Sequence, residues 1–200
     1  MSQERAGTVQ GVRTWIDVTR QSGSRTWDER LVLRRPELAR ALLAVWSRLP
    51  ARWRLRRAWL ARNICRGAAA GNRRDFDLLF LFLDPEIEYE SLISDTGGAV
   101  FPDVVGVQAG HAGYRGTWAA LDEAWDGVRL EHFEVIDFGD RVIAHGRIVG
   151  HARHTGIAVD QPIAQLFTMR RGLVVRQHDF AQLEEALAAV GRTHVTPAPA

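Results

Sequence analysis

The chain has 200 residues, of which 46% are hydrophobic and 25% are charged, with 26 basic and 24 acidic side chains. This composition is typical of one globular domain and excludes a disordered or fibrous chain. Every basic residue is arginine, so Schiff-base chemistry, pyridoxal-phosphate attachment and P-loop phosphate binding are excluded, because each requires a lysine amine.

The first part of the chain predicts a loose arm followed by helices. Up to about Asp28, single apolar residues are scattered among Gly, Ser, Thr and Gln without a sustained period, which is typical of a loose arm. Pro36 suits the first turn of a helix, and the apolar residues after it repeat at helical spacing: Leu38, Ala41, Leu42, Val45 and Leu49. Two further helices are expected over 51–70 and 75–83, the second ending before Pro85.

Charge is distributed unevenly between this helical part and the rest of the chain. Residues 1–74 carry 17 Arg and 5 acidic residues, whereas residues 75–200 carry 9 Arg and 19 acidic residues. A segment rich in Arg and Trp is compatible with binding to nucleic acid or to an anionic membrane. However, arginine stems also cover the outer faces of amphipathic helices, and no recognised basic motif is present. We therefore expect neither nucleic acid nor a membrane as a partner.

After Pro85 the hydrophobic pattern changes from helical towards alternating, which indicates a sheet. A strand over 86–91 is followed by a glycine-rich connection and a helix over 117–125. The remaining strands are expected at 129–137, 141–152, 159–170 and 173–180, with a last helix over 182–190 and a flexible tail over 192–200. Helices followed by an antiparallel sheet predict an α+β fold.

Three other features limit the class of protein. The apolar run 78–83 is far shorter than the roughly 20 residues of a membrane-spanning helix, and the first thirty residues do not resemble a signal peptide. Cys65 is the only cysteine, so an intramolecular disulfide and a multi-cysteine metal site are excluded. We expect a cytoplasmic protein without a bound metal or cofactor.

A set of short segments in a fixed order resembles the nuclear transport factor 2-like superfamily, and within it the SnoaL-like polyketide cyclase branch. These segments are Asn72-Arg73-Arg74-Asp75-Phe76-Asp77, 84–89, 114–118, 137–142, 172–175 and 184–191. The resemblance implies a cone-shaped, curved antiparallel sheet whose concave face is covered by helices. It also implies a deep pocket for a small hydrophobic ligand and a homodimer formed through the outer sheet face. We expect a SnoaL-like domain over 51–191, preceded by an Arg/Trp-rich arm and extra helix over 1–50.

The resemblance places a catalytic carboxylate at Asp179, seven residues after the hairpin glycine Gly172. On an extended strand Val175, Gln177 and Asp179 share one face. Burial in an apolar cone raises the pKa of a carboxylate towards neutrality, where it serves as a general base. The alternatives are an Asp that caps the C-terminal helix or one that is paired with an arginine.

The strand over 141–152 supplies two further catalytic candidates, His145 and Arg147. If their face lines the pocket, they stabilise the anion that forms when Asp179 removes a proton. If it faces outward, both are solvated surface residues, since antiparallel sheets commonly expose one face to water.

The predicted ligand-binding residues are mostly aromatic or histidine side chains, which suit a flat, ring-containing ligand: Tyr89, His111, Trp118, His132, Phe133, Phe167 and Gln177. Together these features predict a cofactor-independent cyclase or isomerase that acts on a polyketide-like substrate with Asp179 as the base. The alternative is a ligand-binding or accessory protein of the same fold that does not turn over its ligand.

Overall fold

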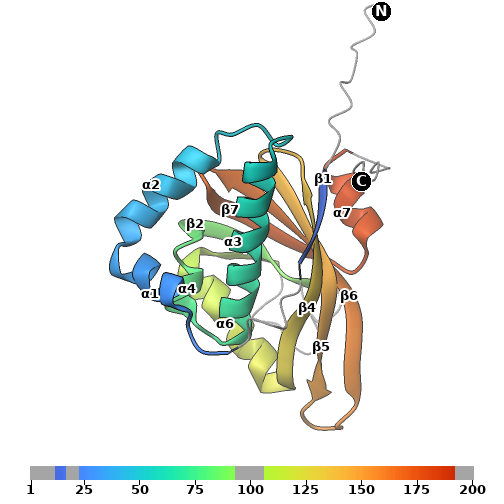
Figure 1. Cartoon of the computed structure of the whole chain (residues 1–200). Coiled ribbons are helices and arrows are strands. Elements are labelled where there is room, and N and C mark those ends of the chain that lie inside the picture. The colour runs from blue at the N-terminus through green and yellow to red at the C-terminus, as the bar shows by residue number, and fades with distance from the viewer. Residues whose placement is uncertain (1–11, 17–22, 93–105, 192–200) are drawn as a thin grey trace, which may run out of the picture.

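The structure, a computed structural model, describes residues 12–16, 23–92 and 106–191. Seven strands form one curved sheet in the order β1-β4-β5-β6-β7-β2-β3 (Figure 1). Their bounds are β1 Val12–Ile16, β2 Leu83–Glu90, β3 Val107–Ala109, β4 Trp125–Asp137, β5 Arg141–Ala152, β6 Ala158–Arg170 and β7 Leu173–Phe180. All neighbouring strands are antiparallel except β2 and β7, which run parallel. The sheet is therefore antiparallel, as expected, apart from this one parallel pair, which the sequence did not predict.

Helices cover the concave side of the sheet, as the α+β prediction required. These are α3 (Arg54–Asn72), α4 (Phe76–Leu79) and α6 (Gly110–Ala124), while α7 (Leu183–Ala189) lies on the opposite side of the sheet (Figure 1). Helices α1 (Trp27–Arg34) and α2 (Pro36–Trp46) extend the layer away from the sheet. No described helix is long and apolar enough to cross a membrane.

The two faces of the sheet are buried in separate hydrophobic clusters. The larger cluster lies inside the cone and includes Val142, Ala144 and Ile148 of β5. The smaller one includes Ile143 of β5 and packs against Leu187 of α7. Because neighbouring residues of a strand point to opposite faces, both faces of β5 carry apolar side chains, and its sequence does not reveal which face is inside.

A buried ion pair joins the helical layer to the sheet. The Arg56 guanidinium donates to both carboxylate oxygens of Asp137 at 2.8 and 3.1 Å. It also donates to the carbonyl oxygens of Ser47, Leu49 and Gly139. Arg56 therefore ties the connection between α2 and α3 to the hairpin between β4 and β5.

Two expected elements differ from the structure. The segment predicted as a loose arm contains β1, which pairs with β4, and the first two residues of α1, which begins with a capping box between Thr26 and Glu29. Helix α6 begins at Gly110, inside the predicted glycine-rich connection. The tail over 192–200 lies outside the described residues, so its predicted flexibility stays a prediction.

Candidate active site

Asp179 lies inside the cone and is 3% exposed. Its Oδ2 accepts a hydrogen bond from the Tyr89 hydroxyl at 2.8 Å. Its Oδ1 accepts hydrogen bonds from the side-chain amides of Gln177 at 2.8 Å and Gln165 at 3.2 Å. Three strands therefore hold the carboxylate, with Tyr89 on β2, Gln165 on β6, and Gln177 and Asp179 on β7. No arginine contacts it among the described residues, so the arginine-paired alternative is not what the structure shows.

Burial raises the pKa of Asp179 from 3.8 to about 6. Loss of water disfavours the ionised form, and this effect exceeds the opposing effect of the three hydrogen bonds and of nearby His178. Burial, together with the charge of Asp179, also raises the pKa of the Tyr89 hydroxyl well above its usual value. Near neutral pH the site therefore holds an ionised carboxylate beside a neutral tyrosine that donates to it.

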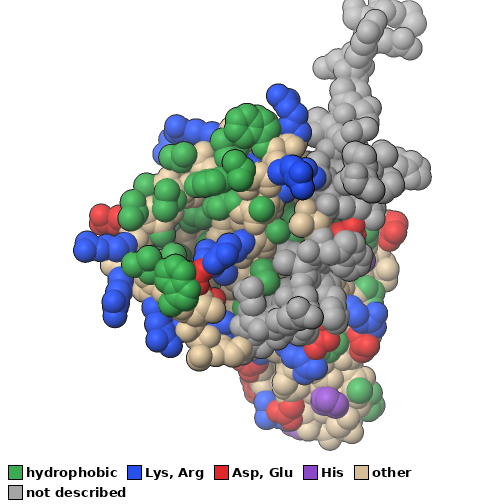
Figure 2. Space-filling model, viewed as in Figure 1, with side chains coloured by type: hydrophobic (Ala, Val, Ile, Leu, Met, Phe, Trp, Pro, Cys, Tyr) green, Lys and Arg blue, Asp and Glu red, His purple; other side chains and the backbone are tan. Residues whose placement is uncertain are grey.

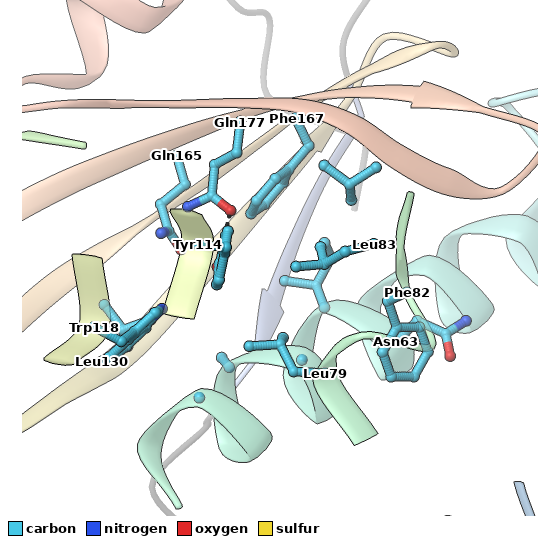
Figure 3. A pocket seen from close by; sticks show the side chains of 15 residues that line it. Asn63, Leu79, Phe82, Leu83, Tyr114, Trp118, Leu130, Gln165, Phe167 and Gln177 are labelled. Carbon is cyan, nitrogen blue, oxygen red and sulfur yellow. Dashed lines mark hydrogen bonds between the residues drawn. The ribbon is translucent and has the colours of Figure 1, made fainter. Parts of the chain in front are cut away.

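A second tyrosine extends this hydrogen-bonded group towards α6. The Tyr114 hydroxyl donates to the side-chain oxygen of Gln177 at 3.1 Å, as drawn in Figure 3. The rings of Tyr114 and Tyr89 are 4.6 Å apart. Tyr114 therefore orients Gln177 so that its amide nitrogen faces Asp179.

Two apolar chambers lie inside the cone, and Trp118, Leu130 and Gln165 belong to the walls of both. The inner chamber lies between α3 and the sheet (Figure 3) and its space amounts to about 520 Å³, including the part open to solvent. The chamber that contains Asp179 and Tyr89 amounts to about 580 Å³ in the same sense. We call it the Asp179 chamber, and because mainly aromatic and aliphatic side chains line it, it suits an apolar ligand.

Two residues that line the Asp179 chamber carry polar atoms without ordinary hydrogen bonds within the described part of the chain. The Ser91 hydroxyl is buried without a partner. Burial raises the pKa of the Tyr114 hydroxyl, and the nearby Trp118 indole N–H opposes this rise in part, although its position does not give it an ordinary hydrogen bond. Buried donors without partners are costly, and a polar group of a ligand in the chamber is suited to accept from them.

Comparison with protein families supplies the identification. The model of the SnoaL-like domain matches residues 66–177, which is more than half of the chain. The chain belongs to the SnoaL-like family. The predicted membership of this branch of the nuclear transport factor 2-like superfamily is thereby confirmed. No match was found among curated proteins.

Solved structures with the same fold resemble this SnoaL-like domain. TerC co-crystallised with polyporic acid is 23% identical, with a TM-score of 0.52 over 65% of this chain and 96% of that chain. A protein of unknown function from Burkholderia pseudomallei is 18% identical, with a TM-score of 0.54 over 64% and 93%. A candidate polyketide cyclase from Xanthomonas campestris pv. campestris is 18% identical, with a TM-score of 0.50 over 76% and 98%. These similarities confirm the predicted cone-shaped fold.

The structure brings several of the predicted site residues of the SnoaL-like domain together. Tyr89 and Trp118 line the Asp179 chamber, and Trp118, Phe167 and Gln177 line the inner chamber. Trp118 is held against Gly71 of α3, where an added Cβ would lie 3.3 Å from the indole ring, and beneath the Arg74 guanidinium, 4.5 Å from the ring centroid.

Arg147 and His145 are not part of this group. They share the face of β5 that carries Ile143, which packs against α7 on the outside of the cone. Arg147 is exposed and donates to Asp160 at 2.5 Å, while His145 lies opposite Glu134 of β4. Their predicted role beside Asp179 does not fit this placement, and the solvated alternative describes Arg147.

The three remaining predicted residues also lie away from Asp179 or outside the description. His111 is in the first turn of α6, stacks on Phe80 at 4.0 Å between ring centroids, and contacts the Leu83 carbonyl at 3.3 Å. It does not line either chamber. The side chains of His132 and Phe133 lie outside the described residues. Across the described part of the chain, no three His, Cys, Asp or Glu residues are grouped to hold a metal ion.

Sequence reasoning missed Tyr114 and Gln165 as site residues. Tyr114 and Trp118 are four residues apart and share the buried face of α6. Because Trp118 was a predicted site residue, this helical spacing was the signal that could have identified Tyr114. Gln165 lies between Ile163 and Phe167 in the alternating pattern of β6, where a polar residue on an apolar face is the signal. Val175, expected beside Gln177, instead forms a bulge opposite β6, so Val174 lines the inner chamber.

Proposed function

We propose that this SnoaL-like domain is a cofactor-independent cyclase or isomerase in which Asp179 removes an acidic carbon-bound proton from an apolar, ring-containing substrate. The observation that carries the proposal is a fully buried carboxylate, with its pKa raised to about 6, in the wall of an apolar chamber. A base with this pKa is ionised at neutral pH and still accepts a proton efficiently.

The proton transfer can be followed at the carboxylate. The electron pair of the substrate C–H bond moves into the adjacent carbonyl group to form an enolate, and the proton goes to Asp179. The neutral acid then returns the proton to another carbon, which gives an isomer. Alternatively, the enolate carbon attacks a second carbonyl of the same molecule, and the acid protonates the new alkoxide, which gives a ring. Tyr89, Gln165 and Gln177 hold the carboxylate in position throughout.

The chamber walls favour a flat substrate with polar oxygens at its edge. The ring faces contact the apolar walls, while the Ser91 hydroxyl and the Trp118 N–H are placed to donate to a carbonyl or enolate oxygen. TerC, which has the same fold, was co-crystallised with polyporic acid, and a candidate polyketide cyclase also has this fold, in line with a small organic substrate.

Deuterium exchange into a simple carbon acid tests the proposal without knowledge of the natural substrate. β-Tetralone, a bicyclic ketone with acidic α-hydrogens, is incubated with the protein in D2O and followed by proton NMR. Wild-type protein should accelerate exchange, and Asp179→Asn should lower the acceleration at least about a hundredfold, as expected for the loss of a general base.

The matched control is Asp160→Asn, which removes a surface carboxylate and should exchange β-tetralone at the wild-type rate. Retained activity in folded Asp179→Asn protein contradicts the assignment of the base. If β-tetralone raises the thermal stability of the wild-type protein but is not exchanged, the ligand-binding alternative is supported instead.

A further inference from the structure

Exposed large hydrophobic side chains are concentrated on the helical extension rather than spread over the surface. Of nine such side chains in the described part of the chain, seven lie between residues 27 and 55. They are Trp27, Leu31, Leu38, Leu42, Val45, Trp53 and Leu55, and we call them the apolar face. Figure 2 shows hydrophobic side chains gathered over this helical side of the molecule, with arginines around them. A contiguous exposed apolar surface usually marks a binding site.

Helical spacing places these side chains together. Leu38, Leu42 and Val45 repeat at intervals of four and three residues, so they form one stripe along α2. The neighbouring side of α2 is buried through Leu43. It packs so closely on the turn between β6 and β7 that a Cβ on Gly172 would lie 2.4 Å from the Leu43 carbonyl oxygen. The stripe is therefore presented outward by a helix that is fixed on its other side.

Ion pairs fix one side of α1 to the segment between α3 and α4. Arg25, just before α1, donates to Asp75 at 2.6 and 2.5 Å. Inside the helix, the buried Glu29 accepts from Arg73 at 3.0 Å. Because these contacts fix one side of α1, Trp27, at 76% exposure, remains on the outside as part of the apolar face.

Seven exposed arginines surround the apolar face, and no acidic partner is found for them within the described ranges. They are Arg30, Arg34, Arg35, Arg40, Arg48, Arg52 and Arg54. Over residues 30–55 Glu37 is the only acidic residue. An apolar surface with Trp and Leu at its centre and arginines at its edge is the pattern of proteins that bind at the surface of an anionic bilayer.

We propose that the apolar face docks on an anionic lipid bilayer, with Leu and Trp side chains in the interfacial region and the arginines against the headgroups. This revises the expectation, drawn from the sequence alone, that a membrane is not a partner. Aliphatic side chains add little to contacts with a phosphate backbone, which disfavours nucleic acid. A second copy of the same face would bring seven uncompensated arginines against seven others, which disfavours self-association through it.

Docking would also place an apolar groove at the bilayer. Leu42 of the apolar face lines a groove between α1, α2 and α3, whose space amounts to about 730 Å³, including the part open to solvent. Asn63 and Phe82 belong to the walls of both this groove and the inner chamber. The groove and the inner chamber share these two walls, and the inner chamber shares Trp118 and Leu130 with the Asp179 chamber, so a mainly apolar route connects the bilayer side to Asp179. This last step rests on the proposed function, whereas the docking itself does not.

Vesicle co-sedimentation of the full chain tests the docking. Phosphatidylcholine vesicles are compared with vesicles that also contain phosphatidylglycerol, at low and high salt. We expect binding to the anionic vesicles, weakened by salt. Leu38→Gln with Leu42→Gln should lower the binding constant at least about tenfold. Arg35→Gln with Arg40→Gln should lower it about fivefold for each arginine removed.

Matched variants elsewhere separate this surface from general effects. Ile157→Gln removes an apolar side chain that is 65% exposed, and Arg170→Gln with Arg176→Gln removes two exposed arginines of β6 and β7. Both should bind vesicles like the wild type, and thermal melts should show that all variants are folded.

Several outcomes would overturn the proposal: equal binding to neutral and anionic vesicles, no binding to either, or binding that is insensitive to the leucine changes. A dimer in analytical ultracentrifugation that these leucine changes abolish would show that a second copy covers the face. Salt-sensitive binding to DNA without vesicle binding would assign the arginines to nucleic acid. None of these measurements depends on β-tetralone exchange, so failure of the docking and failure of the proposed function are distinguishable.

Discussion

At the scale of single residues, the chemistry of this protein depends on how Asp179 is buried. Three neutral donors contact the carboxylate, yet its pKa is raised because the loss of water exceeds their effect. If an arginine were the partner, the pKa would fall instead and the group would be a poor base at neutral pH. The selection of two glutamines and a tyrosine as partners is therefore what makes this aspartate suitable for proton abstraction.

Replacing Asp179 by Asn should stabilise the protein at neutral pH. The pKa of Asp179 in the folded state, about 6, lies above the usual value of 3.8 for an unperturbed aspartate carboxyl group. Because the folded state binds this proton more tightly, its free energy of unfolding falls as pH rises through this window. Asp179→Asn avoids this loss and should be more stable by up to about 3 kcal/mol above pH 7, with no such gain below about pH 4.

Urea unfolding at several pH values measures this difference. Asp160→Asn, at an exposed carboxylate, is the control and should leave the stability close to that of the wild type at every pH. A gain for Asp179→Asn that is the same at pH 4 and pH 8 would argue against a raised pKa.

Tyr89→Phe should move the pH dependence of β-tetralone exchange to higher pH. The Tyr89 hydroxyl donates to Asp179 and holds the pKa of that carboxyl down. Without this hydrogen bond the pKa rises further, so the base is ionised only at higher pH. Tyr114→Phe is the control, because its hydroxyl donates to Gln177 rather than to Asp179, and it should cause a smaller shift. A profile that stays in place for Tyr89→Phe contradicts the role of this donor.

At the scale of secondary-structure elements, the buried pair of Arg56 and Asp137 holds α3 and the sheet in register. Arg56→Gln leaves Asp137 buried without its charged partner and should destabilise the fold by about 3–5 kcal/mol. Thermal or urea unfolding measures the effect. Arg129→Gln, which breaks an exposed pair with Glu131, should cost about 1 kcal/mol or less.

The double variant Arg56→Met with Asp137→Leu removes both charges and should recover much of the lost stability. A double variant as unstable as Arg56→Gln would show that the backbone contacts of Arg56, rather than the ion pair, carry its effect.

Most elements could be predicted from sequence because their signals are local. Strand β7 occupies the predicted range, and α2 begins at the predicted Pro36. Strand β1 was missed because its pairing with β4 joins residues more than a hundred positions apart, and short windows carry no signal for such a contact. The start of α6 was missed because Gly110 and Gly113 lower helix propensity. In the structure these two glycines let the helix pack closely against Pro85 of β2 and Gln108 of β3.

The site was partly predictable for a related reason. Because successive side chains of a strand point to opposite faces of the sheet, the sequence shows which residues share a face. It does not show which of the two faces lies inside the cone. For β7 the resemblance to a family supplied this choice, and Asp179 and Gln177 lie inside the cone. For β5 both faces are apolar in part, because α7 covers the outer one, so alternation alone could not assign Arg147 and His145.

At the scale of the whole molecule, we propose different roles for two regions that differ in charge and polarity. The cone around Asp179 is proposed to carry the chemistry, and the basic, apolar face of α1 and α2 is proposed to contact a bilayer. The resemblance implies a homodimer that forms through the outer sheet face, so its interface would involve neither region. This homodimer stays a prediction. The division of the chain at residues 50 and 191 likewise stays a prediction.

The titration of the Asp179 carboxyl group shows whether this group can act as a base at neutral pH, and it requires no substrate. Carbon-13 NMR of protein labelled at the aspartate carboxyl carbons, with the signal assigned through Asp179→Asn, follows this one group across the pH range. We expect a midpoint near pH 6. A midpoint at or below 3.8, the usual value for an aspartate carboxyl group, would show a hydrated or charge-paired carboxylate, and would contradict the assignment of Asp179 as the base.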